Sequence, residues 1–312
     1  MPQYTPLNST IIDQIASDFM LGKITQWKHL EGGSENTNVR LKTEAGEFVL
    51  TICEQKSMEE TMALAQLLEH LEQHGFTTTR LVKNTNGKYV QHLNGKPILL
   101  KEYLPGEITT DLNETQLLEI GKAMGELHQI PPPSTLPDHF SYGQQAFGEV
   151  TQSGTNDPFV TWLSKLHGQI LENTHPDLPK ALIHGDIFDN NIIVNKNQVI
   201  AIMDFEEACY YYRIFDLGMA IIGSCTTKGN LDFSKARFLL KGYLKISTLE
   251  EIEKEKLPIF TAYAAGATAF WRYRQYRIRK PEKTVWDRHL AMQALADQAL
   301  ASPAGEFMEL AG

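Results

Sequence analysis

The chain has 312 residues, of which 42% are hydrophobic and 9% are aromatic. This composition is sufficient for a folded core and excludes a chain that is disordered throughout. The 38 acidic and 29 basic residues give a formal charge of −9, which excludes a general attraction to nucleic acid or to anionic membranes.

Cysteine content and apolar runs indicate a protein of the cytoplasm. The three cysteines are an odd number without a C-x-x-C pair, so neither a disulfide framework nor a cysteine-bound zinc is expected. The first residues lack a signal-peptide pattern, and the longest apolar stretches fall short of the roughly 18 residues that span a membrane. We therefore expect a cytoplasmic protein with no nucleic-acid and no membrane partner. The oligomeric state stays open.

The first third of the chain has the pattern of a small antiparallel sheet. Helices are expected over 8–21 and 57–74. Three strands are expected within 25–54, where short runs of alternating apolar and polar residues are separated by glycine turns. Two further strands are expected near 88–92 and 97–103.

The chain changes character after the last of these strands, where Pro105 and Gly106 mark a boundary. The sequence therefore predicts two parts, a strand-rich part over 1–105 and a mostly helical part over 106–312. The cleft between two such parts is the default place for a ligand. In the second part, apolar residues at helical spacing predict helices near 113–130, 157–173, 212–224, 233–246, 250–273 and 283–300.

One strand-like segment, 182–205, interrupts these helices and carries the candidate chemistry. Its two apolar runs flank a four-residue turn and predict a hairpin. If Val194 pairs with Val199, then Asn191 and Asp204 become diagonal neighbours no more than about 7 Å apart. One divalent ion would then contact both side chains.

Three oxygen-bearing side chains at this end of the hairpin suit phosphoryl transfer. Mg²⁺ prefers oxygen ligands and keeps some of its waters, and a separate carboxylate must orient the attacking hydroxyl. Asp186, on the loop that enters the hairpin, is the predicted base, and Asn191 and Asp204 are the predicted Mg²⁺ ligands. Each residue taken alone would be interpreted as a loop or turn residue. Their common register with the hairpin favours the catalytic interpretation.

Two residues are predicted to support this loop. His184 is expected to hold it by hydrogen bonds to a carboxylate such as Asp216, with a core imidazole or a phosphate contact as alternatives. Asp216 opens an apolar helical run and is equally a candidate for a helix N-cap.

The pattern H-G-D-x-x-x-x-N at 184–191, followed by I-M-D-F at 202–205, resembles the catalytic and metal motifs of the aminoglycoside phosphotransferase and choline kinase family. The resemblance implies an α+β, protein-kinase-like fold with an antiparallel-sheet N-lobe and a mostly helical C-lobe. It also implies that ATP and Mg²⁺ act as cofactors and that the γ-phosphate passes to a small-molecule hydroxyl. The family's hinge, whose backbone holds adenine, corresponds here to Lys101, Glu102, Tyr103 and Leu104.

Within this family, the chain is most similar to homoserine kinases of the same fold. The sequence G-G-S-E-N-T-N-V-R-L at 32–41 resembles their phosphate-loop hairpin. The resemblance implies that the nucleotide phosphates are bound by the loop that contains Gly33, Ser34, Asn36 and Asn38.

The third strand departs from the pattern of most kinases of this fold. Thr51 stands where most of them place a lysine that grips the nucleotide phosphates, and homoserine kinases look similar at this position. The residue that binds the nucleotide phosphates in place of this lysine is left unassigned, because alternation along a strand does not say whether Arg40, Lys42 or Lys56 points inward.

Charged residues elsewhere are candidates for binding the acceptor. Glu206 and Glu207 follow the predicted metal site, where either would suit a cationic group, although at least one is expected to be a solvated surface carboxylate. The basic run 271–280 interleaves arginines with aromatic residues, a pattern that suits nucleic-acid binding. The acidic net charge of the chain argues against that function. Arg272 or Arg274 is instead expected to meet a carboxylate on the acceptor.

L-Homoserine is the acceptor that these observations favour. Another amino alcohol such as choline or ethanolamine, or an aminoglycoside, is the alternative within the same mechanism. A nucleotide-binding regulatory protein without catalysis is the alternative from another class, because Thr51 replaces the usual lysine. The preference between ATP and GTP stays open.

Overall fold

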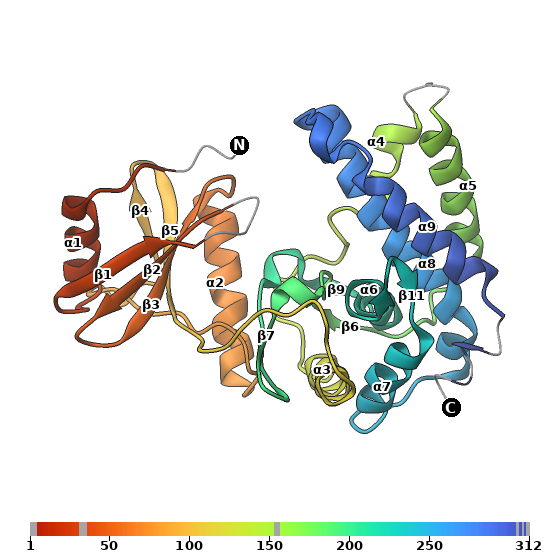
Figure 1. Cartoon of the computed structure of the whole chain (residues 1–312), viewed down its shortest axis with the longest axis horizontal. Coiled ribbons are helices and arrows are strands. Elements are labelled where there is room, and N and C mark those ends of the chain that lie inside the picture. The colour runs from red at the N-terminus through yellow and green to blue at the C-terminus, as the bar shows by residue number, and fades with distance from the viewer. Residues whose placement is uncertain (1–4, 31–35, 153–156, 304–305, 308, 310–312) are drawn as a thin grey trace. The chain divides into compact units, whose positions relative to one another are not determined.

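The computed structural model describes residues 5–30, 36–152, 157–303, 306, 307 and 309. The chain divides into two compact units, Met1–Pro105 and Gly106–Gly312 (Figure 1). Among the described residues, no helix combines the length and apolar character that crossing a bilayer requires.

The first unit is an antiparallel sheet with two helices, as expected. The strands run in the order β1-β2-β3-β5-β4, and each neighbouring pair is antiparallel. The elements are α1 (Ser9–Asp18), β1 (Ile24–His29), β2 (Asn36–Thr43), β3 (Glu47–Cys53), α2 (Met58–Gln73), β4 (Val90–Leu93) and β5 (Lys96–Glu102).

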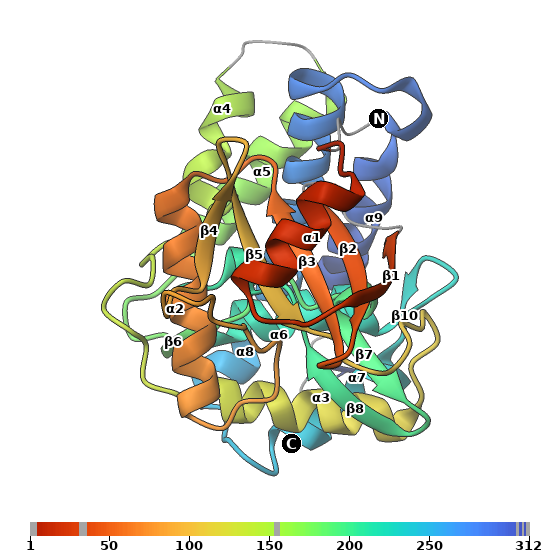
Figure 2. The same ribbon diagram turned by 90° about the vertical axis from the view of Figure 1, so that its left-hand side faces the viewer.

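The two faces of this sheet differ in character. Helix α1 lies across β2 and β3 in Figure 2, and its Ile12 and Ile15 join a buried cluster with Val39 and Leu50. Because side chains alternate along a strand, the residues between those of the cluster lie on the opposite face. That face carries Thr51, which is directly opposite Asn38 on β2. The unit thus presents polar side chains on the face away from α1.

Glu54, just after β3, joins three other segments of the first unit through its carboxylate. These contacts make the stability of the unit depend on pH. Its carboxylate accepts hydrogen bonds from the Thr5 backbone N–H (2.9 Å) and the Thr37 hydroxyl (2.6 Å), and it pairs with Lys96. Burial opposes ionisation of Glu54, but the bonds from Lys96, Thr37 and Thr5 outweigh it and lower the pKa to about 2. The folded state therefore binds this proton less readily than the unfolded chain does.

We expect Glu54→Gln to lower the free energy of unfolding at pH 7 by about 1.5–3 kcal/mol, the range for hydrogen bonds to charged groups. A depressed pKa stabilises the fold above the unfolded value of 4.5, and this contribution is lost as pH falls toward about 2. The difference between wild type and variant should therefore shrink over that window in urea titrations. Glu44→Gln, in the exposed turn after β2, is the matched control and should change the free energy of unfolding little at pH 7.

The second unit is mostly helical, with short paired strands inserted among the helices. Its helices are α3 (Glu114–Leu127), α4 (Gly148–Thr151), α5 (Pro158–Asn173), α6 (Arg213–Ser224), α7 (Phe233–Tyr243), α8 (Glu251–Tyr273) and α9 (Arg288–Ala301). Its strands are β6 (Lys180–Ile183), β7 (Ile192–Asn195), β8 (Gln198–Ile202), β9 (Cys209–Tyr212), β10 (Thr226–Thr227) and β11 (Asn230–Leu231). Single-turn or π-helical segments are Gln144–Ala146, Asp189–Asn191, Phe205–Glu207, Arg274–Arg279 and Lys283–Val285.

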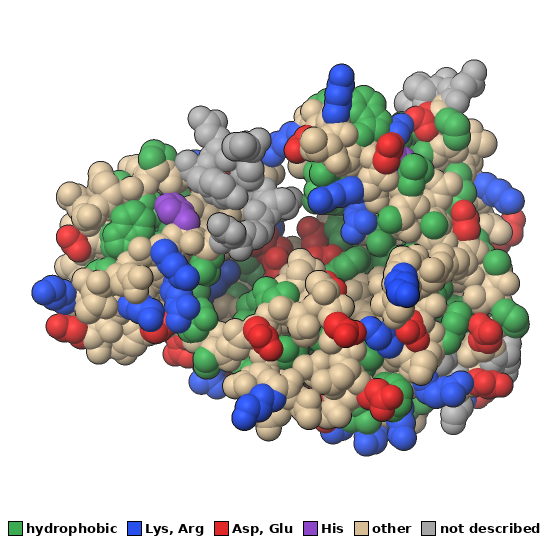
Figure 3. Space-filling view, in the orientation of Figure 1, with side chains coloured by type: hydrophobic (Ala, Val, Ile, Leu, Met, Phe, Trp, Pro, Cys, Tyr) green, Lys and Arg blue, Asp and Glu red, His purple; other side chains and the backbone are tan. Residues whose placement is uncertain are grey.

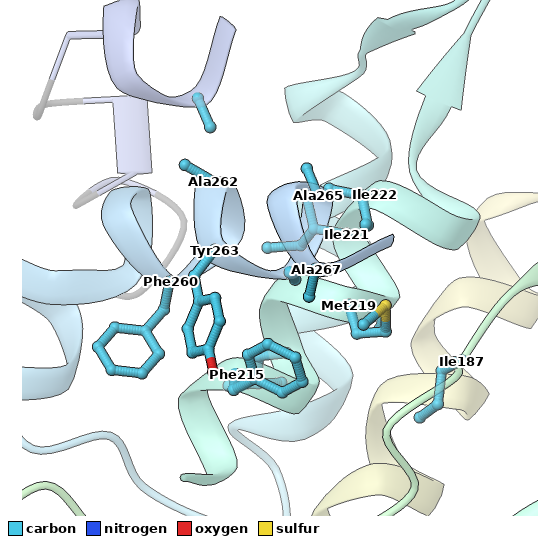
Figure 4. Close-up of a cluster of buried hydrophobic side chains, with 14 of the residues drawn as sticks. Ile187, Phe215, Met219, Ile221, Ile222, Phe260, Ala262, Tyr263, Ala265 and Ala267 are labelled. Atoms are coloured by element: carbon cyan, nitrogen blue, oxygen red, sulfur yellow. The ribbon is translucent and has the colours of Figure 1, made fainter. Parts of the chain in front are cut away.

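Helices α6 and α8 form the centre of this unit's core. Phe215 and Met219 of α6 are buried with Phe260 and Tyr263 of α8 (Figure 4). Ile187, on the loop after β6, joins the same cluster. That loop is therefore fixed by the hydrophobic core on one side.

Three boundaries in the second unit differ from expectation. Strand β9 pairs with β6 in an antiparallel ribbon, although only a helix from residue 212 was expected there. Helix α7 ends at Tyr243 rather than near 246, and α9 begins at Arg288 rather than near 283. Tertiary pairing decides the first of these, because a short aromatic run has no local signal that separates strand from helix.

Candidate active site

The loop between β6 and β7 begins with a backbone turn that only glycine suits. Gly185 has φ +81°, and a Cβ there would lie 2.8 Å from both the Glu207 carbonyl oxygen and the Phe140 ring. Gly223 of α6 approaches the loop from the other side, since a Cβ there would lie 2.2 Å from the Ile187 carbonyl oxygen. The loop that carries Asp186 is thus enclosed by close backbone contacts.

Asp216 anchors the start of this loop from within α6. Its buried carboxylate accepts hydrogen bonds from the backbone N–H groups of His184 (3.1 Å) and Gly185 (2.7 Å). The His128 Nε2 atom lies 3.0 Å from the same carboxylate. Burial opposes ionisation of Asp216, but His128 and the backbone N–H groups outweigh it and hold its pKa below the usual value. The N-cap interpretation is wrong, because Tyr212 occupies the N-cap position.

The His184 ring bonds to two backbone groups. Its Nε2 atom lies 2.7 Å from the Met203 carbonyl oxygen, and its Nδ1 atom accepts from the Asp186 N–H at 3.1 Å. Burial lowers the pKa of His184, which favours the neutral ring that this pattern requires. His184 thus bonds to the Asp216 carboxylate as expected, through its backbone N–H, while its ring joins the loop to the end of β8.

The hairpin has the expected turn but not the expected register throughout. Val194 pairs with Val199 as predicted, but an irregularity between Ile193 and Val194 shifts the remaining pairs by one residue. The Asn191 carbonyl oxygen consequently accepts from the Met203 N–H at 2.8 Å. The inference that Asn191 and Asp204 are diagonal strand neighbours is therefore wrong in detail, because a bulge inserts an extra residue.

Asp204 lies in a left-handed backbone conformation, with φ 67° and ψ 62°. Aspartate and asparagine tolerate this region better than most side chains. The conformation ends the strand and begins the single turn Phe205–Glu207, and the side chain of Asp204 is exposed.

The structure brings Asp186 and Asn191 into contact. The Asn191 side-chain amide donates to the Asp186 carboxylate at 3.0 Å and to the Asp186 carbonyl oxygen at 2.9 Å. Burial raises the pKa of Asp186 to about 7, and the charges of Asp204 and Glu207 add to the effect against smaller contributions from Asn191 and Arg272. Asp186 is thus electrostatically coupled to two other carboxylates and to one guanidinium.

This acidic group fits a divalent cation that is shared with a polyphosphate. Among the described residues, no group of three or more His, Cys, Asp or Glu side chains is arranged to hold a metal by itself. Mg²⁺ commonly takes one or two protein carboxylates and completes its shell with water and phosphate oxygens. Asp204 and the amide oxygen of Asn191 match that partial set, and the accumulated negative charge beside Asp186 favours a cation.

Glu207 and Glu206 differ in their surroundings. The Ser141 hydroxyl donates to the Glu207 carboxylate, and the charge of Glu207 acts on both Asp186 and Tyr142. Glu206, one position earlier in the same turn, is half-buried. Glu207 is half-buried as well, and its charge is coupled to the base.

The basic run divides into one arginine beside the site and others in ion pairs. Arg272 is half-buried, donates to the Arg288 carbonyl oxygen at 3.3 Å and is electrostatically coupled to Asp186. Arg274 pairs with Glu149 at 3.0 Å and Arg277 pairs with Asp157 at 3.3 Å. Basic and acidic side chains are also interspersed on the face shown in Figure 3.

In the first unit, Thr51 takes part in a neutral pair. Its hydroxyl donates to the Asn38 side chain at 2.8 Å, and Asn36 lies two residues earlier on the same strand as Asn38. Gly33 and Ser34 lie outside the described residues. Arg40 lies on the same face as Asn38, bonds to Glu47, and has its guanidinium 3.8 Å from the centre of the Tyr103 ring.

The predicted hinge begins as strand. Lys101 and Glu102 end β5, and the N–H groups of Glu102 and Tyr103 donate to the carbonyl oxygens of Arg80 (2.9 Å) and Glu47 (3.0 Å). Leu104 is half-buried after the strand.

Three residues near the site were missed by the sequence interpretation: His128, Ser141 and Tyr142. His128 ends α3 and reaches Asp216, and its position at the end of an amphipathic helix was the only local signal. Ser141 and Tyr142 lie in an irregular segment, and no spacing rule links that segment to Glu207.

Comparison with known sequences assigns this geometry to a family. The model of the phosphotransferase enzyme family matches residues 26–243. The chain belongs to this family. The phosphotransferase is 27% identical over 282 residues to a homoserine kinase of Pseudomonas aeruginosa, with 87% of each chain covered.

Solved structures with low identity support the fold. The phosphotransferase resembles an amicoumacin kinase in complex with AMP-PNP and Ca²⁺, with a TM-score of 0.72 and 16% identity over 96% of this chain and 95% of that chain. It also resembles a microcompartment-associated aminopropanol kinase, with a TM-score of 0.71 and 15% identity over 97% and 100% of the two chains. These likenesses confirm the expected kinase-like fold.

Proposed function

We propose that the phosphotransferase is an ATP-dependent kinase that phosphorylates the side-chain hydroxyl of L-homoserine. The observation that carries this proposal is the constellation around Asp186, which is bonded to Asn191 and coupled to Asp204, Glu207 and Arg272. The homoserine kinase named among its relatives supports this choice of acceptor.

Asp186 is the group that orients the acceptor hydroxyl. It lies at the start of the loop, next to the residues that Asp216 fixes, and its carboxylate is held by the Asn191 amide. As the acceptor oxygen bonds to the γ-phosphorus and the bridging P–O bond breaks, the hydroxyl proton passes to Asp186. The raised pKa of Asp186 suits this role, because a base works best near the operating pH.

Asn191 and Asp204 would hold the cation, which we propose to be Mg²⁺. Such an ion neutralises the charge that develops on the phosphate oxygens. The amicoumacin kinase complex contains Ca²⁺ and AMP-PNP, which supports a divalent cation and ATP as the pair to test.

The acceptor is proposed to be recognised through its two charged groups. Glu207 would bind the ammonium of homoserine and Arg272 its carboxylate, because both are coupled to Asp186 while their charges are opposite. Two opposite charges flanking a base suit a zwitterionic amino acid better than a simple amino alcohol, which would leave Arg272 without a role. We keep Glu206 as a weaker candidate for the ammonium.

The first unit is proposed to bind the nucleotide. Lys101, Glu102, Tyr103 and Leu104 are the candidates for contacting adenine. Gly33 and Ser34, together with Asn36 and Asn38 of β2, are the candidates for the phosphates. Thr51 supplies no positive charge, and Arg40 is a cation on the same face of the sheet.

We expect Arg272→Ala to raise KM for L-homoserine by about tenfold or more, the range for lost bonds to a charged group. The same variant should leave KM for ethanolamine unchanged, because ethanolamine has no carboxylate. ADP release with ATP and Mg²⁺ measures both values. Arg274→Ala is the matched control, since Arg274 is paired with Glu149. Better turnover of ethanolamine than of homoserine by the wild type would contradict the acceptor.

A further inference from the structure

Residues 137–144 form an irregular segment, here called the acceptor segment, that is fastened at both ends. The Tyr210 N–H of β9 donates to the Pro137 carbonyl oxygen at 2.7 Å. At the other end, the Gln144 N–H donates to the buried Tyr263 hydroxyl of α8 at 2.8 Å. The segment therefore does not depend on its own local structure for its position.

Aromatic packing fixes the middle of the acceptor segment. The Phe140 ring lies 4.2 Å from the Tyr142 ring and 4.7 Å from the Phe215 ring, measured between centroids. Phe140 also contacts the backbone at Gly185, directly before Asp186. Ser141 lies between these two buried aromatic residues in the chain and is itself exposed, so the packing of its neighbours fixes the backbone from which its hydroxyl extends.

The Ser141 hydroxyl bonds to one particular carboxylate. Ser141 donates to Oε2 of Glu207. Glu206 and Glu207 are consecutive in a tight turn, so their side chains leave it about 120° apart. The Glu207 carbonyl oxygen lies beside Gly185, directly before Asp186, and the charge of Glu207 acts on Asp186, so Glu207 is the glutamate that we assign to the site.

We propose that Ser141 is a positioning residue that holds Glu207 in the orientation needed to bind the ammonium group of the acceptor. An ionised glutamate accepts hydrogen bonds only, so the Ser141 hydroxyl occupies one acceptor direction of Oε2 and thereby sets the orientation of the carboxylate. A long side chain on a partly exposed turn otherwise samples several rotamers. This inference rests on the proposed function, since it assigns Glu207 to the acceptor.

Ser141→Ala should raise KM for L-homoserine roughly three- to tenfold with little change in kcat, the range for a hydrogen bond that solvent partly replaces. For 4-hydroxybutyrate, which has the same hydroxyl and carboxylate without the ammonium, kcat/KM should not change. Ser141→Thr keeps the hydroxyl and should restore KM toward the wild-type value. Ser164→Ala in α5, whose hydroxyl donates to the Val160 carbonyl oxygen in its own helix, is the matched control.

A double variant separates positioning from a general effect on the loop. In a Glu207→Gln background the ammonium partner is already lost, so adding Ser141→Ala should cost little more. An equal loss for homoserine and 4-hydroxybutyrate, or a full additional loss in the Glu207→Gln background, would overturn the role of Ser141. Failure of the wild type to phosphorylate homoserine would instead overturn the proposed acceptor, and the role of Ser141 with it.

Discussion

Replacement of Asp186 by asparagine is expected to lower kcat about a hundredfold or more, while the affinity for ATP stays close to that of the wild type. Asparagine keeps the shape and the bond to Asn191 but cannot take the proton of the acceptor hydroxyl. Steady-state ADP release gives kcat, and calorimetric titration with a non-hydrolysable ATP analogue gives the affinity.

Stability measurements show whether a loss of activity in Asp186→Asn is caused by unfolding. Burial and the charges of Asp204 and Glu207 raise the pKa of Asp186 to about 7 in the folded enzyme without ligands. An acid with a raised pKa costs the folded state free energy where it is ionised, so Asp186→Asn should not lower Tm at pH 8. Asp189→Asn, on the same loop and half-buried, is the matched control and should keep nearly full activity. Near-normal turnover by Asp186→Asn would remove Asp186 from the chemistry.

Replacement of Asp204 by asparagine is expected to lower activity by about a hundredfold or more and to raise the Mg²⁺ concentration needed for half-maximal activity. A bound cation supplies several kcal/mol of charge stabilisation in the transition state, and an amide is a poorer ligand than a carboxylate. Asparagine tolerates the left-handed conformation at φ 67°, so the backbone should be preserved. Activity measured over a Mg²⁺ series tests both effects.

The same Mg²⁺ series shows whether Asp204 is a metal ligand. Asp204 is exposed and follows the end of β8, so its replacement should leave Tm nearly unchanged. Glu206→Gln, two residues later in the same turn, is the control for lost negative charge near the site. An Asp204→Asn enzyme with wild-type Mg²⁺ dependence would rule out Asp204 as a metal ligand.

The sequence predicted the elements that have strong local signals. The five-stranded antiparallel sheet, the helices with amphipathic periodicity and the hairpin turn at Val194 and Val199 all follow from patterns within short windows. The proximity of Asp186 and Asn191 was also predictable, since five residues on one loop separate them.

What the sequence could not predict depends on contacts between distant segments. The bulge before Val194 changes the register by one residue, and no local pattern marks it. The bond from Ser141 to Glu207 joins residues on separate segments of the chain that only the folded second unit brings together. Asp216 was ambiguous because a carboxylate near a helix start serves equally as a cap or as a partner for a backbone elsewhere.

The most direct test of the central claim is to identify the product. Wild-type enzyme and the Asp186→Asn variant would be incubated with ATP, Mg²⁺ and L-homoserine, and the reaction followed by ³¹P NMR and mass spectrometry. We predict that the wild type forms O-phosphohomoserine and ADP in equal amounts and that the variant forms neither at a comparable rate. ATP consumption without phosphorylated homoserine, or equal product formation by both enzymes, would contradict it.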